Sequence, residues 1–439
     1  MNTNKYNYMR KNPIKSKNKS LTDKVAAIIL AGGEGTRLYP LTLSRCKPAV
    51  SFGGTYRLID IPISNALNAR LGHIFILSQY LANSLNQHIS ETYRLDPFQG
   101  AIIEMLSPED RAGKKIWYEG TADAVRKNLA YLLEFDIDYF VILSGDQLYN
   151  MDLLDLVGFA KETGADLTVA TLPVCKTDAK RMGLMQIDSK HRITDFYEKP
   201  QKDSLLDTFE LDKKLLEGNE PCYLGSMGIY VFKRQALVDL LTEHDGIDFG
   251  KHLIPAQIKK GNTFAYFYRG YWEDIGTIAS YYDANLALTT QTLALDLYDE
   301  TNPIYAHPQH LPSPVIENTR IKDSIIGQGS VIEASEITHS LIGLRAVIGS
   351  GTTIHDSIII GNQFYASPDQ RQEDLPPKFC IGKNCQIERA IIDEHTQIGD
   401  NVKLINKDHL ETYDSAIVYI RDGIIVVPPG SIIPDNFVL

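Results

Sequence analysis

Two basic residues follow a glycine-rich loop near the beginning of the chain, an order that suits the binding of phosphate groups. The apolar run at 27–30 predicts a buried parallel strand. Glycines after such a strand permit positive φ and let backbone N–H groups approach an anion. Arg37 can donate paired hydrogen bonds to phosphate oxygens, and Lys47 can supply a compact positive charge. The loop residues expected around the phosphates are Gly32, Gly33, Gly35 and Thr36.

An acidic residue follows a second apolar run. Residues 139–143 predict a buried strand, and Ser144, Gly145 and Asp146 come directly after it. In open α/β sheets ligands bind beyond the carboxyl ends of the strands. Because Mg²⁺ prefers one or two carboxylates together with substrate phosphates, we predict that Asp146 binds Mg²⁺. The alternative is a turn or helix-cap aspartate ahead of Asp152.

The order of these segments predicts an α/β domain over residues 25–297, a Rossmann-like fold with a mainly parallel sheet. Residues 73–78 predict another buried strand, and 121–135 predict a helix with one apolar face. Residues 298–313 contain three prolines among polar residues and predict an interdomain linker.

Residues 314–439 carry a repeat of about six residues, with isoleucine recurring at steps of five or six. Hexapeptide periodicity predicts a parallel β-helix, expected to be left-handed, in which each repeat supplies one strand and one interior side chain. The run 362–379 interrupts the repeat and predicts a loop. The expected interior positions include Ile326, Ile332, Ile337, Ile342, Ile348, Ile354, Ile360, Ile381, Ile387, Ile392, Ile398 and Leu404.

Composition excludes several classes of protein. A chain of 439 residues is too long for one ordinary hydrophobic core, so two domains are expected. A net charge of −11 argues against a nucleic-acid-binding surface. No apolar run is long enough to span a membrane, and five scattered cysteines predict no disulfide framework, so a cytoplasmic setting is the simplest expectation. Residues 1–24 are basic, rich in Asn and Lys, and predicted to be disordered; a plastid transit peptide is the alternative.

Three motifs together resemble one enzyme family. The glycine spacing matches neither the dinucleotide-binding fingerprint nor the P-loop. Instead GGEGTRL at 32–38, RCKPAV at 45–50 and FGGTYRLID at 52–60 resemble the glucose-1-phosphate adenylyltransferases, a branch of the sugar-nucleotide pyrophosphorylases. The resemblance extends from about residue 25 to the C-terminus. It implies transfer of AMP from ATP to glucose 1-phosphate for glycogen or starch synthesis, allosteric control and a homotetramer.

The same resemblance assigns further site residues. It implies a second metal ligand, Asp274, although Glu273 beside it leaves that choice open. The alternative to a binding role for Tyr118 is an aromatic side chain of the core. The alternative for Glu198 and Lys199 is an ordinary pair of solvated surface residues. The residues implied to contact ATP are Gln79, Gly120, Thr121 and Asp123, with Gly120 and Thr121 expected at a helix start that offers free N–H groups. Those implied to contact glucose 1-phosphate are Tyr118, Gly183, Glu198, Lys199 and Ser226.

The implied reaction demands little covalent help from the protein. A phosphate monoester is mostly dianionic at neutral pH, since its second pKa is about 6, so the attacking group needs no general base. Charge neutralisation and in-line positioning of two repelling phosphates are the requirements. Arg37 and Lys47 suit that role.

The chain also departs from its relatives where they carry anion-binding lysines. Ser44, Thr55 and the run 426–430 occupy such positions here. We therefore expect fructose 1,6-bisphosphate and 3-phosphoglycerate to activate weakly or not at all. Two alternatives remain: an enzyme for another nucleotide or hexose phosphate, and a non-catalytic regulatory subunit. The presence of both Arg37 and Lys47 argues against the second.

Overall fold

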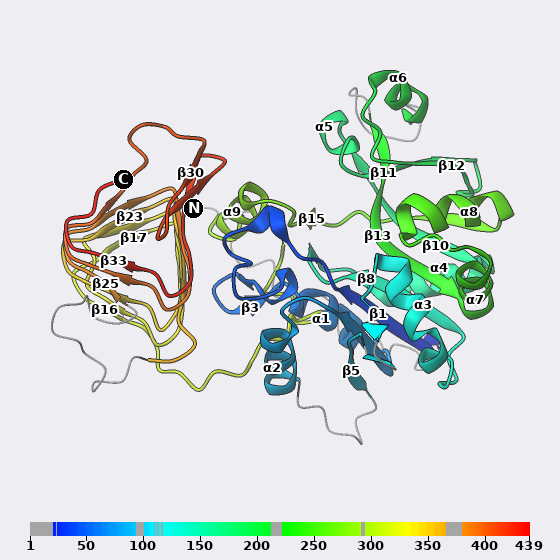
Figure 1. Cartoon of the computed structure of the whole chain (residues 1–439), viewed down its shortest axis with the longest axis horizontal. Helices are drawn as coiled ribbons and strands as arrows, with labels where there is room; N and C mark the ends of the chain where they lie inside the picture. The colour runs from blue at the N-terminus through cyan, green and yellow to red at the C-terminus, as the bar shows by residue number, and fades with distance from the viewer. Residues whose placement is uncertain are drawn as a thin grey trace, which may run out of the picture.

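Two domains follow one another along the chain in the structure, which is a computed structural model. It describes residues 21–22, 24–93, 101–108, 110–111, 114–115, 117–211, 222–290, 295–365 and 380–439. An α/β domain and a domain of stacked short strands are joined by a segment, 303–314, that forms neither helix nor strand (Figure 1). Residues 1–20 and 23 of the tail predicted to be disordered, and residues 366–379 of the predicted loop, lie outside these residues.

A mixed sheet, nine-stranded over the described residues, forms the centre of the α/β domain. Its parallel part contains β1 (Val25–Ala31), β4 (His73–Ser78), β5 (Ile102–Leu106) and β8 (Tyr139–Ser144). The strand β13 (Tyr223–Lys233) pairs antiparallel with β8, β10 and β11. The sheet also contains β10 (Leu167–Val174), β11 (Gly183–Ile187), β12 (Ile193–Glu198) and β14 (Thr263–Phe267). The predicted α/β fold is confirmed.

The continuous apolar run of β1 is explained by cores on both faces of the sheet. Alternate residues, among them Ala27 and Ile29, pack on one side, whereas Ala26 and Ile28 pack on the other. The first face is covered by α1 (Asp60–Asn68), α2 (Ala82–Thr92), α4 (Leu153–Thr163) and α9 (Ile278–Ala287). The second is covered by α3 (Thr121–Leu132), α7 (Arg234–Glu243) and α8 (Ile254–Lys260).

Short elements complete this domain and carry much of the cleft described below. One-turn helices are η3 (Thr36–Leu38), η4 (Lys47–Ala49), α5 (Lys176–Ala179), α6 (Asp203–Leu206), η6 (Asp207–Phe209) and the wider η8 (Phe249–Leu253). Two-stranded pairs are β2 (Ser51–Phe52) with β3 (Tyr56–Arg57), β6 (Asp110–Arg111) with β7 (Lys114–Lys115), and β9 (Gln147–Tyr149) with β15 (Trp272–Asp274). In Figure 1 the segment containing α5, β11, β12 and α6 projects above the sheet.

The C-terminal domain is a prism of three sheets, as the hexapeptide repeat predicts. One sheet contains β16 (Val315–Ile316), β19 (Val331–Ile332), β22 (Val347–Ile348), β25 (Cys380–Ile381), β28 (Gln397–Ile398) and β33 (Ile432–Ile433). The second contains β17 (Arg320–Lys322), β20 (Glu336–Thr338), β23 (Thr353–His355), β26 (Gln386–Glu388) and β29 (Lys403–Leu404). The third contains β18 (Ile325–Ile326), β21 (Leu341–Leu344), β24 (Ile358–Gly361), β27 (Ala390–Ile392), β32 (Ile424–Val427), β31 (Tyr419–Arg421) and β30 (Thr412–Asp414).

One expected interior position is wrong. Ile359 fills the prism, whereas Ile358 and Ile360 point outward and join the core of the α/β domain. Three consecutive isoleucines hide which one faces inward, because a sheet face covered by another domain is as apolar as the interior. Leu341, and Val426 on the same sheet, belong to this shared core. The two domains are therefore packed together along one apolar face.

A buried cluster of charges reinforces this packing. Arg45, in the segment just before η4, donates hydrogen bonds to both oxygens of Asp393 from the β-helix. Its other terminal nitrogen lies 3.3 Å from Glu394, which also accepts a 2.7 Å hydrogen bond from Ser51. The side chains of Arg45 and Asp393 are 6% and 0% exposed. Such a buried pair is costly to break because one partner is left charged and unpaired.

We expect Asp393→Ala to lower the free energy of unfolding by up to about 3–5 kcal/mol, the usual cost of breaking a buried pair, because Arg45 then keeps only Glu394. The measurement is the thermal or denaturant midpoint of the whole chain. Asp136→Ala is the control, because Asp136 pairs with Lys24 at the surface and its side chain is 81% exposed; its midpoint should equal that of wild type. A small effect of Asp393→Ala would show that the domains are held by apolar contacts alone.

Candidate functional site

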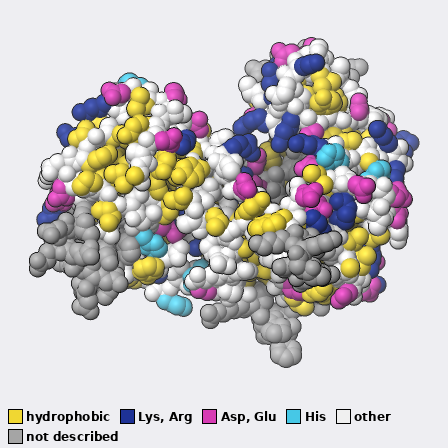
Figure 2. Space-filling model, in the orientation of Figure 1, with side chains coloured by type: hydrophobic (Ala, Val, Ile, Leu, Met, Phe, Trp, Pro, Cys, Tyr) yellow, Lys and Arg dark blue, Asp and Glu magenta, His cyan; other side chains and the backbone are white. Residues whose placement is uncertain are grey.

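A cleft of ≈ 980 Å³ opens where β1, β4 and β8 end, between the sheet and the projecting segment. In Figure 2, Lys and Arg side chains gather along the upper rim of the hollow below that segment. Most of the residues predicted from the sequence come together in its lining: Gly32, Gly33, Arg37, Lys47, Gln79, Tyr118, Gly120, Thr121, Asp146, Gly183, Glu198, Lys199, Ser226 and Asp274. The lining does not include Gly35, Thr36 and Asp123.

Lys47 lies between the two predicted metal ligands. Its Nζ is 2.5 Å from Asp146 Oδ2 and 3.9 Å from Asp274 Oδ1. The β9–β15 pair brings the carboxylates together, because Asp274 is directly opposite Gln147, the residue after Asp146. Ser144 also donates a hydrogen bond to Asp146. A single ammonium thus compensates two carboxylates at the end of β8.

The two carboxylates respond differently to this environment. Burial alone would raise the pKa of Asp146, but the Lys47 ammonium and the Ser144 hydroxyl bring that pKa below its ordinary value. Burial, followed by the like charge of Asp146, raises the pKa of Asp274 above its ordinary value, although Lys47 and Arg37 oppose the rise. Two neighbouring acids whose pKa values are shifted in opposite directions mark a place where a further cation would be stabilised.

The glycine-rich loop positions both cations. Gly35 has φ +66°, and a Cβ there would lie 2.9 Å from the Cβ of Lys47, so only glycine fits without displacing the lysine. Arg37 is exposed and reaches across to the other side. A Cβ on Gly276 would lie 3.6 Å from both terminal nitrogens of Arg37 and 3.5 Å from Asp274. Arg37 and Lys47 therefore approach Asp274 from two directions.

The start of α3 differs from the expectation of free N–H groups. The N–H groups of Ala122 and Asp123 both donate to the carbonyl of Ile247, at 2.9 and 3.2 Å. The Thr121 hydroxyl makes no cap; it accepts from the N–H of Phe249 at 3.1 Å. The Asp123 carboxylate accepts from Glu119 N–H at 2.9 Å, outside the cleft lining. A partner far along the chain uses these donors, which sequence spacing could not reveal.

Gln79 connects the end of β4 to the loop before α3. Its Nε2 donates to the carbonyl of Tyr118 at 3.2 Å, and its Oε1 accepts from the N–H of the same residue. The Tyr118 hydroxyl accepts a 2.9 Å hydrogen bond from Asn128. Gln79 therefore holds the loop that carries Tyr118 and Gly120 against the cleft.

Glu198 and Lys199 lie on the opposite side, at the end of β12. A Cβ on Gly183 would lie 2.7 Å from the Glu198 carboxylate, so only glycine leaves room for it. Lys199 Nζ is 3.8 Å from Glu198 Oε1, and its side chain is 55% exposed to the cleft. Lys199 also has φ +50° although proline follows it, a conformation that bulky residues rarely adopt. Ser226 is buried in β13, at the floor.

Several lining residues were missed by the sequence analysis. Asp248 and Gly250 border Glu198, and a Cβ on Gly250 would lie 2.9 Å from Glu198 Oε2. Asp248 caps η8 by accepting from the N–H of Lys251 at 2.9 Å. An aspartate before a short helix gives the capping signal, but nothing in the spacing places it beside Glu198. Arg181, on the rim, was also missed.

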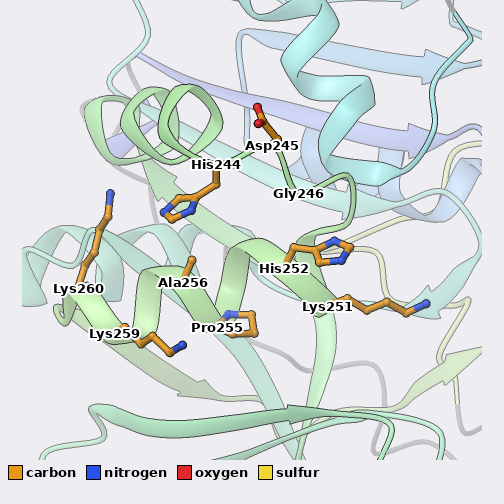
Figure 3. Close-up of a pocket in the computed structure, with 9 residues that line it drawn as sticks. All are labelled: His244, Asp245, Gly246, Lys251, His252, Pro255, Ala256, Lys259 and Lys260. Carbon is orange, nitrogen blue, oxygen red and sulfur yellow. The ribbon is translucent and has the colours of Figure 1, made fainter.

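A second, smaller hollow of ≈ 660 Å³ is lined by the loop 244–246, η8 and α8 (Figure 3). It contains Lys251, His252 and Lys260, but Figure 3 shows Lys251 and Lys260 extending in different directions. Lys260 is paired with Glu243. Because these lysines diverge and Lys260 is already paired, the first cleft is the stronger candidate.

Two acids of the cleft, Asp146 and Asp274, meet beside Lys47. Over the described parts of the chain, no cluster of three or more His, Cys, Asp or Glu side chains could hold a metal by itself. Asp146 and Asp274 alone would need substrate oxygens to complete a coordination shell, which is how Mg²⁺ is usually bound.

None of the described helices is both long and apolar enough to cross a membrane.

Comparison with known families agrees with this geometry. A family of proteins described as nucleotidyl transferases matches residues 26–291, which is more than half of the chain and contains the whole cleft. The chain belongs to the nucleotidyl transferase family. Residues 309–438 match the GLGC left-handed parallel beta-helix domain. This pair of domains, in this order, is the architecture characteristic of glucose-1-phosphate adenylyltransferases, so the resemblance found in the sequence is confirmed.

Glu198→Gln should stabilise this nucleotidyl transferase near neutral pH. Burial raises the pKa of Glu198, with Lys199 opposing. The folded state therefore holds the proton more tightly, so the stability linked to Glu198 is present at low pH and is lost as pH rises through the raised pKa. We expect a higher thermal midpoint for the variant at pH 7, and a difference that shrinks as pH falls toward the ordinary glutamate value, about 4.3.

The control for this comparison is Glu162→Gln, an exposed glutamate on α4. It should give no pH-dependent gain. Equal midpoints for Glu198→Gln and wild type at both pH values would mean that the ionised carboxylate is not destabilising in the cleft.

Proposed function

We propose that this protein transfers AMP from ATP to glucose 1-phosphate, releasing pyrophosphate and forming ADP-glucose for glycogen or starch synthesis. The observation that carries the proposal is the arrangement of Lys47 between Asp146 and Asp274, with Arg37 alongside, at the carboxyl ends of β1 and β8. Cations facing paired carboxylates at that edge suit a phosphate chain and a divalent metal. The choice of ADP-glucose rests on the match of the second domain.

The residues divide the work of the proposed reaction. The sugar phosphate is already a nucleophile at neutral pH, so the cleft has to orient it in line with the α-phosphorus and reduce the repulsion between two anions. Arg37 and Lys47 neutralise charge on the nucleotide phosphates. Lys199 contacts the phosphate of the sugar, and Glu198 accepts hydrogen bonds from its hydroxyl groups, while Ser226 lies at the floor.

Asp146 and Asp274 fit a divalent cation, which we take to be Mg²⁺. Both carboxylates approach the Lys47 ammonium, and the pKa of Asp274 stays raised although Lys47 and Arg37 oppose the rise, so a further positive charge would be stabilised there. When bound, the metal would neutralise charge that builds up on the phosphate oxygens. Glu273 is adjacent, but Asp274 is the residue whose carboxylate approaches Lys47.

The remaining features of the proposal concern assembly and control. We infer a homotetramer in the cytoplasm, or in a plastid if the tail is a transit peptide. Weak response to phosphorylated activators also remains our expectation. It is supported by Arg45, which is buried and already paired with Asp393, and by Arg421, which is paired with Asp414. Neither is available to replace the lysines absent at Ser44 and Thr55.

Pyrophosphate release tests the proposed function directly. With glucose 1-phosphate and Mg²⁺, we expect a kcat/KM for ATP far above those for UTP and dTTP. Preference for UTP or dTTP would assign a related sugar nucleotide instead. No release with any of the three nucleotides would contradict the proposal and favour a regulatory subunit.

Asp146→Asn should fold normally and lose turnover by orders of magnitude. The change removes one metal ligand and the partner of Lys47, and both act on charge that is greatest in the transition state. Asp136→Asn is a matched control at the protein surface. Turnover within about tenfold of wild type, which corresponds to only about 1.4 kcal/mol, would reject Asp146 as a metal ligand.

Lys199→Ala should raise the KM for glucose 1-phosphate far more than the KM for ATP, since its contact is with the sugar phosphate. Lys190→Ala, an exposed lysine in the turn between β11 and β12, is the control and should change neither constant. If the two constants rose together for Lys199→Ala, the lysine would be acting on the nucleotide or on the fold.

A further inference from the structure

Two of the five cysteines, all free in the structure, lie opposite each other on neighbouring strands. The ladder between β10 and β13 ends with Val174 opposite Tyr223. Cys175 follows Val174 and Cys222 precedes Tyr223, so antiparallel register makes them the next opposed pair. The backbone at Cys175 is extended, with φ −76° and ψ 170°, and continues the strand direction before α5 begins. The two side chains therefore lie on the same face.

The hydrogen bonds around Cys222 define which kind of pair this is. Its carbonyl accepts from the N–H of Leu211 at 2.9 Å, on the side away from β10. In an antiparallel strand the N–H and C=O of one residue point to the same side. Cys175 and Cys222 thus form a non-hydrogen-bonded pair, whose Cα atoms are about 4.5 Å apart in such ladders. Disulfides span Cα separations of about 4.4–6.8 Å, so the backbone need not move to join them.

The two thiols also differ in their exposure to solvent. Cys175 is exposed and lines the cleft, whereas Cys222 is partly buried. Burial raises the pKa of the Cys222 thiol, and the neighbouring Cys175 adds to the rise. An accessible thiol beside a protected one is the arrangement in which the first reacts with the oxidant and the second resolves the mixed disulfide.

We propose that Cys175 and Cys222 form a reversible disulfide at the rim of the cleft, with a low-molecular-weight disulfide as the oxidant. The Cys175 thiolate attacks one sulfur of the oxidant, forming a mixed disulfide and releasing one thiol. Cys222 then loses its proton and attacks the Cys175 sulfur, releasing the second thiol. Two protein thiols are oxidised to one disulfide, and the oxidant is reduced to two thiols.

Oxidation would alter the cleft through a chain of polar contacts. In the reduced form the Cys175 thiol donates to Asp178 Oδ2 at 3.1 Å, and Asp178 pairs with Arg181 at 2.5 Å. Arg181 is close enough to Glu273 and Asp274 for both to favour its charged form. The disulfide has no proton to donate, so Asp178 loses one partner. We expect a several-fold lower kcat/KM for the sugar phosphate in the oxidised form, a consequence that rests on the proposed function.

The test starts with the full-length wild-type chain and oxidised glutathione. After alkylation of remaining thiols and proteolysis, mass spectrometry should find the peptides containing Cys175 and Cys222 linked, and dithiothreitol should separate them. Cys385 in the β-helix is buried, so it should not be oxidised and should be recovered in the alkylated form after unfolding. If wild-type Cys175 carries only glutathione, or links to a different cysteine, the proposal is overturned. This result does not depend on any enzymatic activity.

Cys222→Ser provides the matched variant, since Cys222 does not line the cleft. It should retain basal activity, stop at the glutathione adduct on Cys175, and show no linked peptide. Wild type should lose kcat/KM on oxidation and recover it with dithiothreitol. Formation of the wild-type disulfide without any change in kcat/KM would overturn the coupling through Asp178.

Discussion

The ammonium of Lys47 keeps two carboxylates together that would otherwise repel each other, and much of the α/β domain contributes to this contact. The parallel strand β8 ends at Asp146, and the pairing of β9 with β15 brings Asp274 beside it. Gly35 leaves room for the lysine side chain. Because opposite charges in a partly enclosed cleft interact more strongly than in water, small displacements of any of these elements would change the charge balance at the site.

The β-helix is connected to the same contact through the backbone. Arg45 lies two residues before Lys47 and is buried against Asp393 and Glu394 of the β-helix. Desolvating these groups is expensive, and their mutual pairing offsets the cost only in one geometry. The segment that carries Lys47 is therefore held by two contacts, one between Lys47 and the glycine loop and one between Arg45 and the second domain. A domain without cleft residues thus helps to position a cation in the cleft.

The parts of the site that follow strand ends could be predicted from the sequence. Apolar runs mark β1 and β8, and polar residues after them fall at one edge of the sheet, which is why Arg37, Lys47 and Asp146 were found. Contacts that depend on tertiary register could not be. Ile247 accepts hydrogen bonds from the N–H groups at the start of α3, and Asp248 approaches Glu198. Each of these contacts is between segments that share no sequence periodicity.

The β-helix shows the same division between pattern and packing. A six-residue repeat identifies the coils and most interior positions. It cannot separate inward from outward side chains where both faces are apolar, as at Ile358 to Ile360. Family resemblance supplied the residues that pattern alone would have missed, including Asp274 and Lys199, because it carries information on where distant segments meet.

The left-handed backbone conformation at Lys199 lowers the stability of the fold, whereas the lysine side chain supplies a charge for binding. A lysine with φ +50° before a proline is strained, by roughly 1–3 kcal/mol for residues held in such regions. Glycine or asparagine would relieve the strain, yet neither carries a positive charge. Selection for heat resistance alone would therefore tend to replace this residue and discard the cation that faces the cleft. A screen for thermostable variants of this protein therefore has to include a measurement of activity. Without it, Lys199 will be among the first residues to be replaced.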